Sequence, residues 1–168
     1  GAALQYWERT VRFPQALRGR LATALTIANL ADLRLRLGLI DHAEHAIALR
    51  VGQVVKDRVE IVNPELRHHV IVEVPLAAGM EPLDARLANA PAEARPSQPD
   101  TVAVSYQAQL DDRMVYVFDE LPAGNYRFYF RSRATVPGSF TQPPSTAEMM
   151  YRRAVNGGSA GARIVISR

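Results

Sequence analysis

The sequence contains no cysteine, which excludes disulfide bonds, thiol catalysis and thiolate metal ligands. Lys56 is its one lysine, so almost all of its positive charge comes from arginine. No hydrophobic run approaches the length needed to cross a bilayer. No signal peptide is present, but an exported parent would carry its signal upstream, so this absence decides nothing. The sequence has no S-x-x-K element, and its G-x-S-x-G match, Gly-Gly-Ser-Ala-Gly at 157–161, has no long helix behind it, so we expect a flexible connection into the last strand there. The chain must therefore be held together by packing alone, and it carries no evident catalytic group.

The residues that are present describe an ordinary folded chain of 168 residues, of which 48% are hydrophobic and 22% are charged. This length and balance suit one domain, 1–168, and argue against disorder. The formal net charge is +3. The arginines are scattered among carboxylates, as in Asp57-Arg58 and Asp111-Asp112-Arg113, and form no basic run. We therefore expect a solvated surface and no nucleic-acid partner.

Apolar and polar residues alternate with a period of two along most of the chain, which is typical of half-buried β-strands. The alternating runs cover residues 33–39, 55–61, 69–74, 102–110, 126–131 and 164–166. Residues 20–30 fit a strand or a short helix, and Thr23, Thr26 and Ile27 favour the strand. In the clearest run, Tyr126, Phe128 and Phe130 should point into a core. Arg127, Tyr129 and Arg131 should then face solvent or a partner.

Turn signals rich in glycine, proline and aspartate separate these runs. Short strands at this spacing predict an all-β fold, a two-sheet antiparallel β-sandwich. Residues 84–100 are rich in alanine, proline and small polar residues, and we expect a surface loop there. Residues 145–153 predict one short helix, because Ser145 or Thr146 can cap its start and Arg152 and Arg153 suit its end.

Histidine is the remaining candidate for metal chemistry. On a helix, His42 and His45 would share a face and could hold zinc, and Asp41 and Glu44 lie beside them in the sequence. Their segment lies between two strand patterns, however, so a polar hairpin turn is the favoured interpretation. His68 and His69 open a strand, where neighbours point to opposite faces and cannot chelate one ion. One packed and one exposed histidine is expected there, and we expect no metal or other cofactor.

Six segments carry a resemblance by their order and spacing. They include V-G-Q-V-V-K-D-R-V-E-I-V at 51–62 and P-P-S-T-A-E-M-M-Y at 143–151, with 67–82, 111–118, 121–124 and 126–140 between them. Each is a weak motif alone, but together they cover most of residues 47–168. They resemble the C-terminal macroglobulin-like domain of bacterial alpha-2-macroglobulins, and residues 1–46 match it more loosely.

The resemblance implies a β-sandwich with a short crossover helix, similar to the receptor-binding domain of animal macroglobulins. It implies a large periplasmic parent, often tethered to the inner membrane by an N-terminal lipid, that traps proteases after bait-region cleavage. The thioester of many members contains a cysteine and belongs to a different domain. The implied partners are the neighbouring domains of the parent, a second envelope protein, and target proteases acting through the parent, without direct membrane insertion.

We therefore predict a non-catalytic binding and conformational module of a protease-trapping macroglobulin. Its candidate partner contacts are Arg127, Tyr129, Arg131, Tyr151, Arg152 and Arg153, although for each residue alone the favoured interpretation is plain solvation, or structural packing for Tyr151. One alternative is a purely structural, adhesin-like sandwich that spaces other domains. Another, from the enzyme class, is a small metallohydrolase centred on His42 and His45.

Overall fold

The structure of the protein is a computed structural model that describes residues 6–12 and 46–168. The strand expected at 33–39, the segment 20–30 and the histidine pair His42 and His45 lie outside the described residues. Across the described ranges, the one helical element is a single 3-10 turn, η1 (Ala92–Ala94), and the rest is strands and their connections.

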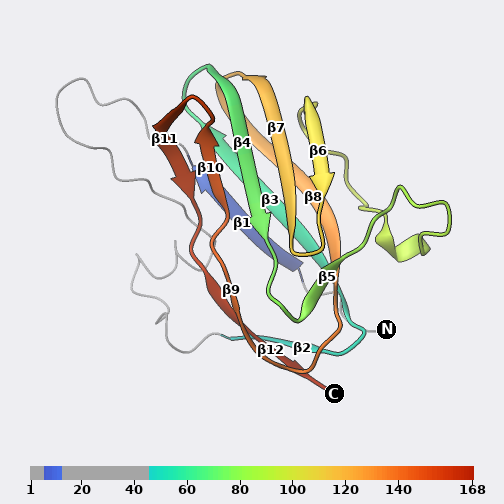
Figure 1. Cartoon of the computed structure of the whole chain (residues 1–168). Coiled ribbons are helices and arrows are strands. Elements are labelled where there is room, and N and C mark those ends of the chain that lie inside the picture. Colours follow the sequence, from blue (N-terminus) through green and yellow to red (C-terminus); the bar gives the residue numbers. More distant parts are fainter. Residues whose placement is uncertain (1–5, 13–45) are drawn as a thin grey trace.

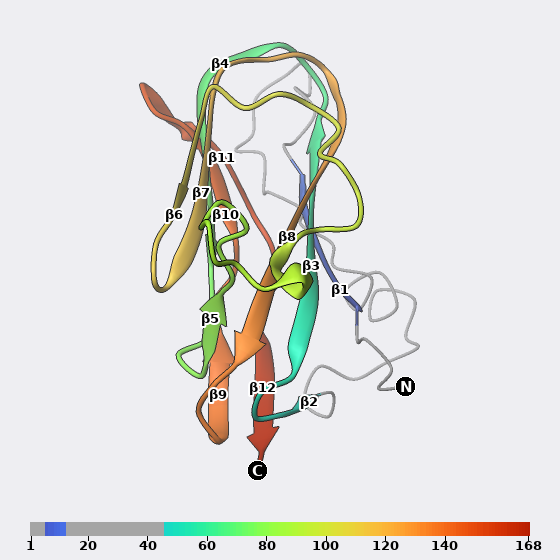
Figure 2. The ribbon, with the colours of Figure 1, turned by 90° about the vertical axis from the view of Figure 1, so that its right-hand side faces the viewer.

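The strands form three sheets, and the two larger sheets face each other (Figures 1 and 2). The four-stranded sheet has the order β1 (Tyr6–Arg12), β3 (Val54–Asn63), β8 (Gly124–Ala134) and β5 (Met80–Pro82). The five-stranded sheet has the order β11 (Arg152–Gly158), β10 (Thr146–Met149), β4 (Arg67–Pro75), β7 (Arg113–Leu121) and β6 (Tyr106–Gln109). A small third sheet has the order β2 (Ile47–Arg50), β12 (Ala162–Ser167) and β9 (Gly138–Gln142).

The core lies between the two larger sheets, where the predicted alternation places apolar side chains. Phe128 of β8 is fully buried, and its ring centroid lies 4.9 Å from that of Tyr116 and 5.6 Å from that of Phe118, both on β7. The contacts therefore run from one sheet to the other, as sandwich packing requires. The predicted all-β sandwich is confirmed, although a small third sheet joins the two predicted ones and the pairs β1–β3 and β2–β12 are parallel, not antiparallel.

The helix predicted at 145–153 is wrong. The segment forms β10, a turn at Met150 and Tyr151, and the start of β11. β10 pairs with β4 on one side and with β11 on the other. Local capping signals favoured the helix, but completing the sheet beyond β4 buries Ala147 and satisfies the backbone groups of four residues at once. The pairing of β10 with β4 therefore overrides the local preference for a helix.

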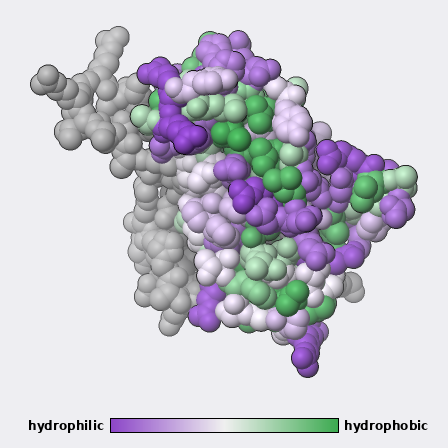
Figure 3. All heavy atoms as spheres, viewed as in Figure 1, coloured by the Kyte–Doolittle hydropathy of each residue, from purple (hydrophilic) through white to green (hydrophobic). Residues whose placement is uncertain are grey.

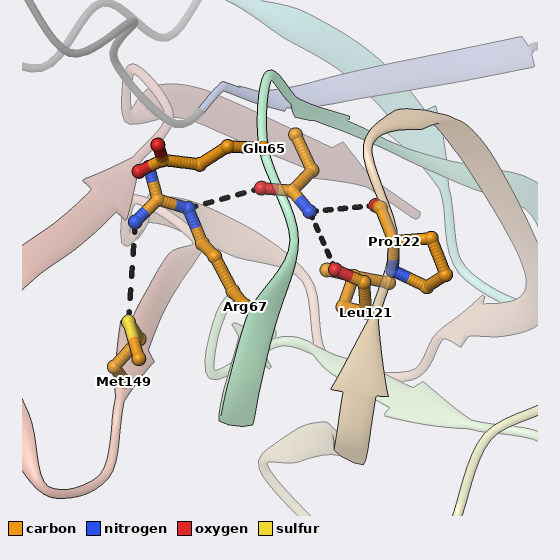
Figure 4. Close-up of polar contacts among 6 residues, drawn as sticks. Glu65, Arg67, Leu121, Pro122 and Met149 are labelled. Carbon is orange, nitrogen blue, oxygen red and sulfur yellow. Dashed lines mark hydrogen bonds and ion pairs between the residues drawn. The ribbon is translucent and has the colours of Figure 1, made fainter.

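The chain crosses between the two large sheets at two adjacent points, and Asn63 joins them (Figure 4). Its Nδ2 donates to the carbonyl oxygens of Leu121 (2.8 Å) and Pro122 (2.7 Å), where β7 leads into β8. Its Oδ1 accepts a hydrogen bond of 3.0 Å from Nε of Arg67, where β3 has led into β4. Asn63 is buried, so this one amide ties both crossings together.

Arg67 extends the same network towards the β10–β11 hairpin. Its guanidinium lies 3.1 Å from the carboxylate of Glu65 and donates from Nη1 to the sulfur of Met149 at 3.9 Å. Burial lowers the pKa of Arg67, while the carboxylate of Glu65 acts to raise it. A buried arginine that pairs with a neighbouring carboxylate therefore connects the sheet crossing to β10.

Residues 83–105 contain no strand and run along the free edge of β8 beyond β5. The amide of Leu83 donates to the carbonyl of Arg131 (2.8 Å). Farther along, Asp100 Oδ1 accepts from the amide of Tyr129 (2.9 Å), and Thr101 exchanges hydrogen bonds with the backbone of Arg127. The segment thus occupies backbone groups that an open sheet edge would leave unpaired.

The strand expected over 102–110 is shorter than predicted, because β6 begins at Tyr106. Val102 and Val104 pack against the core, whereas Tyr106 and Leu110 are 61% and 48% exposed. The amide of Ser105 donates to the carbonyl of Val117, the residue that also pairs with Tyr106. Two residues thus oppose one, as in a β-bulge, and the side chains that follow change face.

We predict that Asn63→Ala destabilises the 168-residue chain by roughly 3 kcal/mol. The substitution removes the hydrogen bonds that Asn63 makes with two carbonyl oxygens and with the Nε of Arg67 in a buried site. Urea unfolding followed by tryptophan fluorescence and circular dichroism would measure the change. The control is Asn125→Ala, since Asn125 is exposed on the neighbouring strand, opposite Val62. A control loss as large as that of Asn63→Ala would contradict the role assigned to the buried amide.

We also predict that Asp100→Ala increases the exchange rate of the Tyr129 amide roughly fivefold, for about 1 kcal/mol of lost hydrogen bonding. The amide of Phe128 serves as an internal control, because Phe128 is paired with Val59 inside the sheet. Hydrogen exchange followed by NMR would give both rates. Equal acceleration at the two amides would mean that the substitution loosens the entire sheet instead of its edge.

Candidate functional site

The six predicted contact residues lie on two different sheets. Three of them, Arg127, Tyr129 and Arg131, belong to β8 in the four-stranded sheet. The other three, Tyr151, Arg152 and Arg153, lie at the β10–β11 turn and the start of β11, in the five-stranded sheet. The structure therefore does not bring the two groups into one site.

On β8, the predicted solvent-facing row is interrupted. Arg127 is exposed and lies 3.7 Å from the carboxylate of Glu60, while Tyr129 is half-buried. The expectation that Arg131 faces solvent is wrong, because Arg131 is 8% exposed. Segment 83–105 lies over it, and residues 96–98 share a small hollow with its side chain. Coverage by a distant loop cannot be read from strand alternation.

The second group lies at an exposed end of the sandwich. We define the hairpin tip as Met150 and Tyr151 together with His69 and Leu66 from the adjacent start of β4. Tyr151 is 80% exposed, Leu66 53% and Met150 43%. The ring of Tyr151 meets that of His69 edge-on, with centroids 5.2 Å apart. Large apolar and aromatic side chains thus project together from one end of the molecule.

The backbone of β4 is irregular at this tip. His69 has φ +52°, a left-handed conformation that a non-glycine residue adopts only where its surroundings impose it. The amide of Met150 donates to its carbonyl at 2.8 Å, and His69 drops out of the pairing with β7. The expectation of one packed and one exposed histidine is wrong: His68 and His69 are both exposed, because the break in the pleat removes the alternation.

Positive charge borders the tip. Arg152 and Arg153 follow Tyr151 directly and are exposed, and Nε of Arg153 lies 3.9 Å from the carboxylate of Glu148. Such a surface can bury aromatic area against a partner and surround it with charged contacts, as protein interfaces do. Sequence reasoning missed Leu66, His69 and Met150 as members of this surface. The run of two methionines and a tyrosine was the signal for Met150, and the helix prediction obscured it, whereas Leu66 and His69 join the tip only through the pairing of β4 with β10.

Residues 6–12 and 46–168 hold no group of three His, Asp or Glu side chains that could bind a metal ion. In the same ranges, no helix has the length and hydrophobicity that crossing a membrane requires.

The chain matches the family model described as "Bacterial Alpha-2-macroglobulin MG10 domain" over residues 36–153. It is also similar to a curated alpha-2-macroglobulin homolog from Nostoc sp. strain PCC 7120. The two are 25% identical over 123 residues, which cover 73% of this chain and 6% of the relative. The chain therefore spans a small fraction of the length of the curated relative that it matches.

Solved structures agree with this fold. Trypsin-activated alpha-2-macroglobulin from Escherichia coli aligns with a TM-score of 0.61 and 19% identity, over 71% of this chain and 9% of that one. Salmonella alpha-2-macroglobulin reacted with methylamine gives 0.59 and 21%, over 71% and 8%. The native E. coli protein, spanning domain MG7 to the C-terminus, gives 0.55 and 18%, over 74% and 21%.

The matched model covers more than two thirds of this chain, and the solved structures share its sandwich. The chain therefore belongs to the bacterial alpha-2-macroglobulin MG10 domain family, as a macroglobulin-like domain.

Proposed function

We propose that this chain is a non-catalytic docking and conformational module of a protease-trapping bacterial alpha-2-macroglobulin. The family match over residues 36–153 carries the proposal. Solved E. coli relatives are described as activated by trypsin or by porcine elastase, so proteases act on those proteins. By analogy, target proteases would act on the parent of this chain, and the module would respond to the cut through its contacts with neighbouring domains.

The setting of the parent is part of the proposal. The chain corresponds to 6% of the Nostoc relative, so most of the trapping machinery would lie in other domains. We place the module at the C-terminal end of an exported periplasmic parent, and a lipid anchor in the inner membrane accords with the family resemblance. No chemical step is assigned to this domain, because the resemblance is to proteins that inhibit proteases.

The hairpin tip is the surface that we assign to docking. Tyr151 is 80% exposed, and its ring is supported from one side by His69 at 5.2 Å. An aromatic ring held in place by a neighbour loses little conformational entropy on binding, which suits an interface anchor. Arg67 ties Met149 to the sheet crossing, so contact at the tip is mechanically linked to the core of the sandwich. A neighbouring domain of the parent is the expected partner, and a second envelope protein is the next.

The β8 residues Arg127 and Tyr129 receive no docking role in this proposal. The backbone of both is engaged by residues 100 and 101, and the side chain of Arg127 lies near Glu60. A purely structural spacer remains the rival function, and it predicts a tip that contacts nothing. The metallohydrolase alternative predicts one bound zinc per chain in a metal analysis of the purified protein.

Hydrogen exchange of the intact parent, before and after cleavage by trypsin or elastase, tests the docking proposal. We expect the amides of residues 149–153 to exchange more slowly in the uncut parent than in the isolated 168-residue chain, because the tip is covered by a neighbour. Cleavage should change that protection. Identical exchange in parent and isolated chain, with both folded, would support the spacer instead.

Tyr151→Ala in the parent should weaken this docking by about 2 kcal/mol, the usual size of an aromatic anchor. The expected result is faster exchange of residues 149–153 in the uncut state, towards the rate of the isolated chain. Val136→Ala is the matched control, because Val136 is 49% exposed and belongs to the β8–β9 connection, which lies at the opposite end of the sandwich (Figure 1). A change of equal size in the control would point to general destabilisation.

A further inference from the structure

The free edge of β6 is a second exposed feature, separate from the hairpin tip. β6 is the last strand of the five-stranded sheet and pairs with β7 on one side (Figure 1). The amide of Leu110 donates to the carbonyl of Arg113 (2.9 Å), so Leu110 and Arg113 form a hydrogen-bonded pair of the β6–β7 ladder. Because hydrogen-bonded pairs alternate in antiparallel strands, the N–H and C=O groups of Gln107 and Gln109 point away from β7.

The composition of β6 does not protect this edge. Its sequence is Tyr-Gln-Ala-Gln, without charge, proline or glycine. By comparison, β11 at the other end of the sheet begins with Arg152 and Arg153, and β5 ends at Pro82. Residues 83–105 cover the exposed part of β8. Edge strands usually carry such safeguards against pairing with another chain, so their absence in β6 is informative.

The outer face beside β6 is apolar. The register places Tyr106 next to Val117 of β7, which lies next to Ile71 of β4. The next row pairs Ala108 with Val115 and continues to Glu73 of β4, so its apolar part ends at β7. In Figure 3, hydrophobic residues gather over the region of β4 and β7, with hydrophilic residues around them. We call the apolar residues of these rows the apolar stripe. A strand added to β6 would extend the apolar stripe, so the residues that it turns to the outer face should be aliphatic.

An acidic groove of about 680 Å³ opens at the C-terminal end of β6. Leu76, Met80 and Leu110 supply apolar walls, and Glu81, Asp84 and Asp111 supply carboxylates. Arg86 pairs with Asp84, but within the described ranges the carboxylates of Glu81 and Asp111 form no ion pair. Apolar walls with carboxylates suit an arginine or lysine, whose stem packs while its head is paired.

We propose that the free edge of β6 binds an extended segment of a partner protein as an added antiparallel strand, with aliphatic residues at alternate positions and a basic residue at its N-terminal end. Every neighbouring pair in this sheet is antiparallel, and the added strand continues that pattern. Antiparallel addition places the N-terminus of the segment beside Gln109, where the acidic groove begins. The backbone of Gln107 and Gln109 supplies the hydrogen bonds, the apolar stripe selects the alternation, and the groove selects the charge.

A fluorescent peptide, Arg-Ser-Val-Thr-Val-Thr-Val amide, is the probe, titrated against the 168-residue chain by fluorescence anisotropy. We expect saturable binding, and slower exchange of the Gln107 and Gln109 amides by about tenfold at saturation. The same peptide with N-methyl groups on its β6-facing amides should not bind. Failure of the unmodified peptide to bind at millimolar concentration would overturn the proposal.

Two variants separate the edge from the groove. Gln107→Pro removes an outward N–H without touching the pairing with β7, and should weaken binding about tenfold. The double variant Glu81→Gln and Asp111→Asn should abolish the preference for the arginine peptide over a glutamate-for-arginine peptide. Tyr151→Ala should leave affinity unchanged, which keeps this surface distinct from the proposed docking tip. Amide exchange of the unmodified chain decides the matter if Gln107→Pro fails to fold.

A second copy of the chain is the competing occupant. Sedimentation of the chain without peptide measures self-association directly. A monomer supports the proposal, whereas a dimer that Gln107→Pro abolishes would overturn it, because β6 would then be closed by its own copy.

Discussion

The structure depends on a single buried amide at the place where the chain changes sheets. Asn63 donates to two carbonyls of the β7–β8 connection and accepts from the guanidinium of Arg67 at the start of β4. A sandwich needs such crossings, and each exposes backbone groups that neither sheet can pair. Because Asn63 satisfies both crossings with one side chain, the two sheets are held in one relative position, and Phe128 can fill the space between them.

The exposed tip is a consequence of the same junction. Arg67 reaches Met149, and two residues later the left-handed backbone at His69 breaks the pleat of β4. That break turns His68 and His69 to solvent and brings His69 against Tyr151. Backbone strain of this kind costs about 1–3 kcal/mol and persists where the surroundings over-determine it. Here the strained residue supports the most exposed tyrosine ring of the described chain, at a position suited to contact with another domain.

The two candidate surfaces differ in their physical basis. The tip offers side chains, mainly aromatic, and would recognise the shape of a partner. The β6 edge offers mainly backbone groups and would recognise an extended conformation, with the neighbouring apolar face and acidic groove selecting its aliphatic and basic side chains. In a protein of many domains, the first kind suits a fixed neighbour and the second suits a segment that is released or displaced. Neither surface uses the open edge of β8, because residues 83–105 occupy it.

Much of the fold was predictable from the residues. The alternation at 55–61, 69–74 and 126–131 identified β3, β4 and β8, because a half-buried strand must turn every second side chain to the core. The motif series identified the family. The sequence named the candidate site only in part, since Tyr151, Arg152 and Arg153 were among the predicted contacts and Leu66, His69 and Met150 were not.

The sequence by itself determined the periodicity, the turns and the lack of cysteine chemistry, because each of these depends on neighbouring residues alone. The tertiary structure decided that 145–153 is a hairpin, since β4 offered a ladder that outweighed local helix signals. It also decided that Arg131 is covered and that the apolar parity changes at Ser105, since both depend on distant segments. Local patterns specify which faces can be buried, and packing between sheets specifies which ones are.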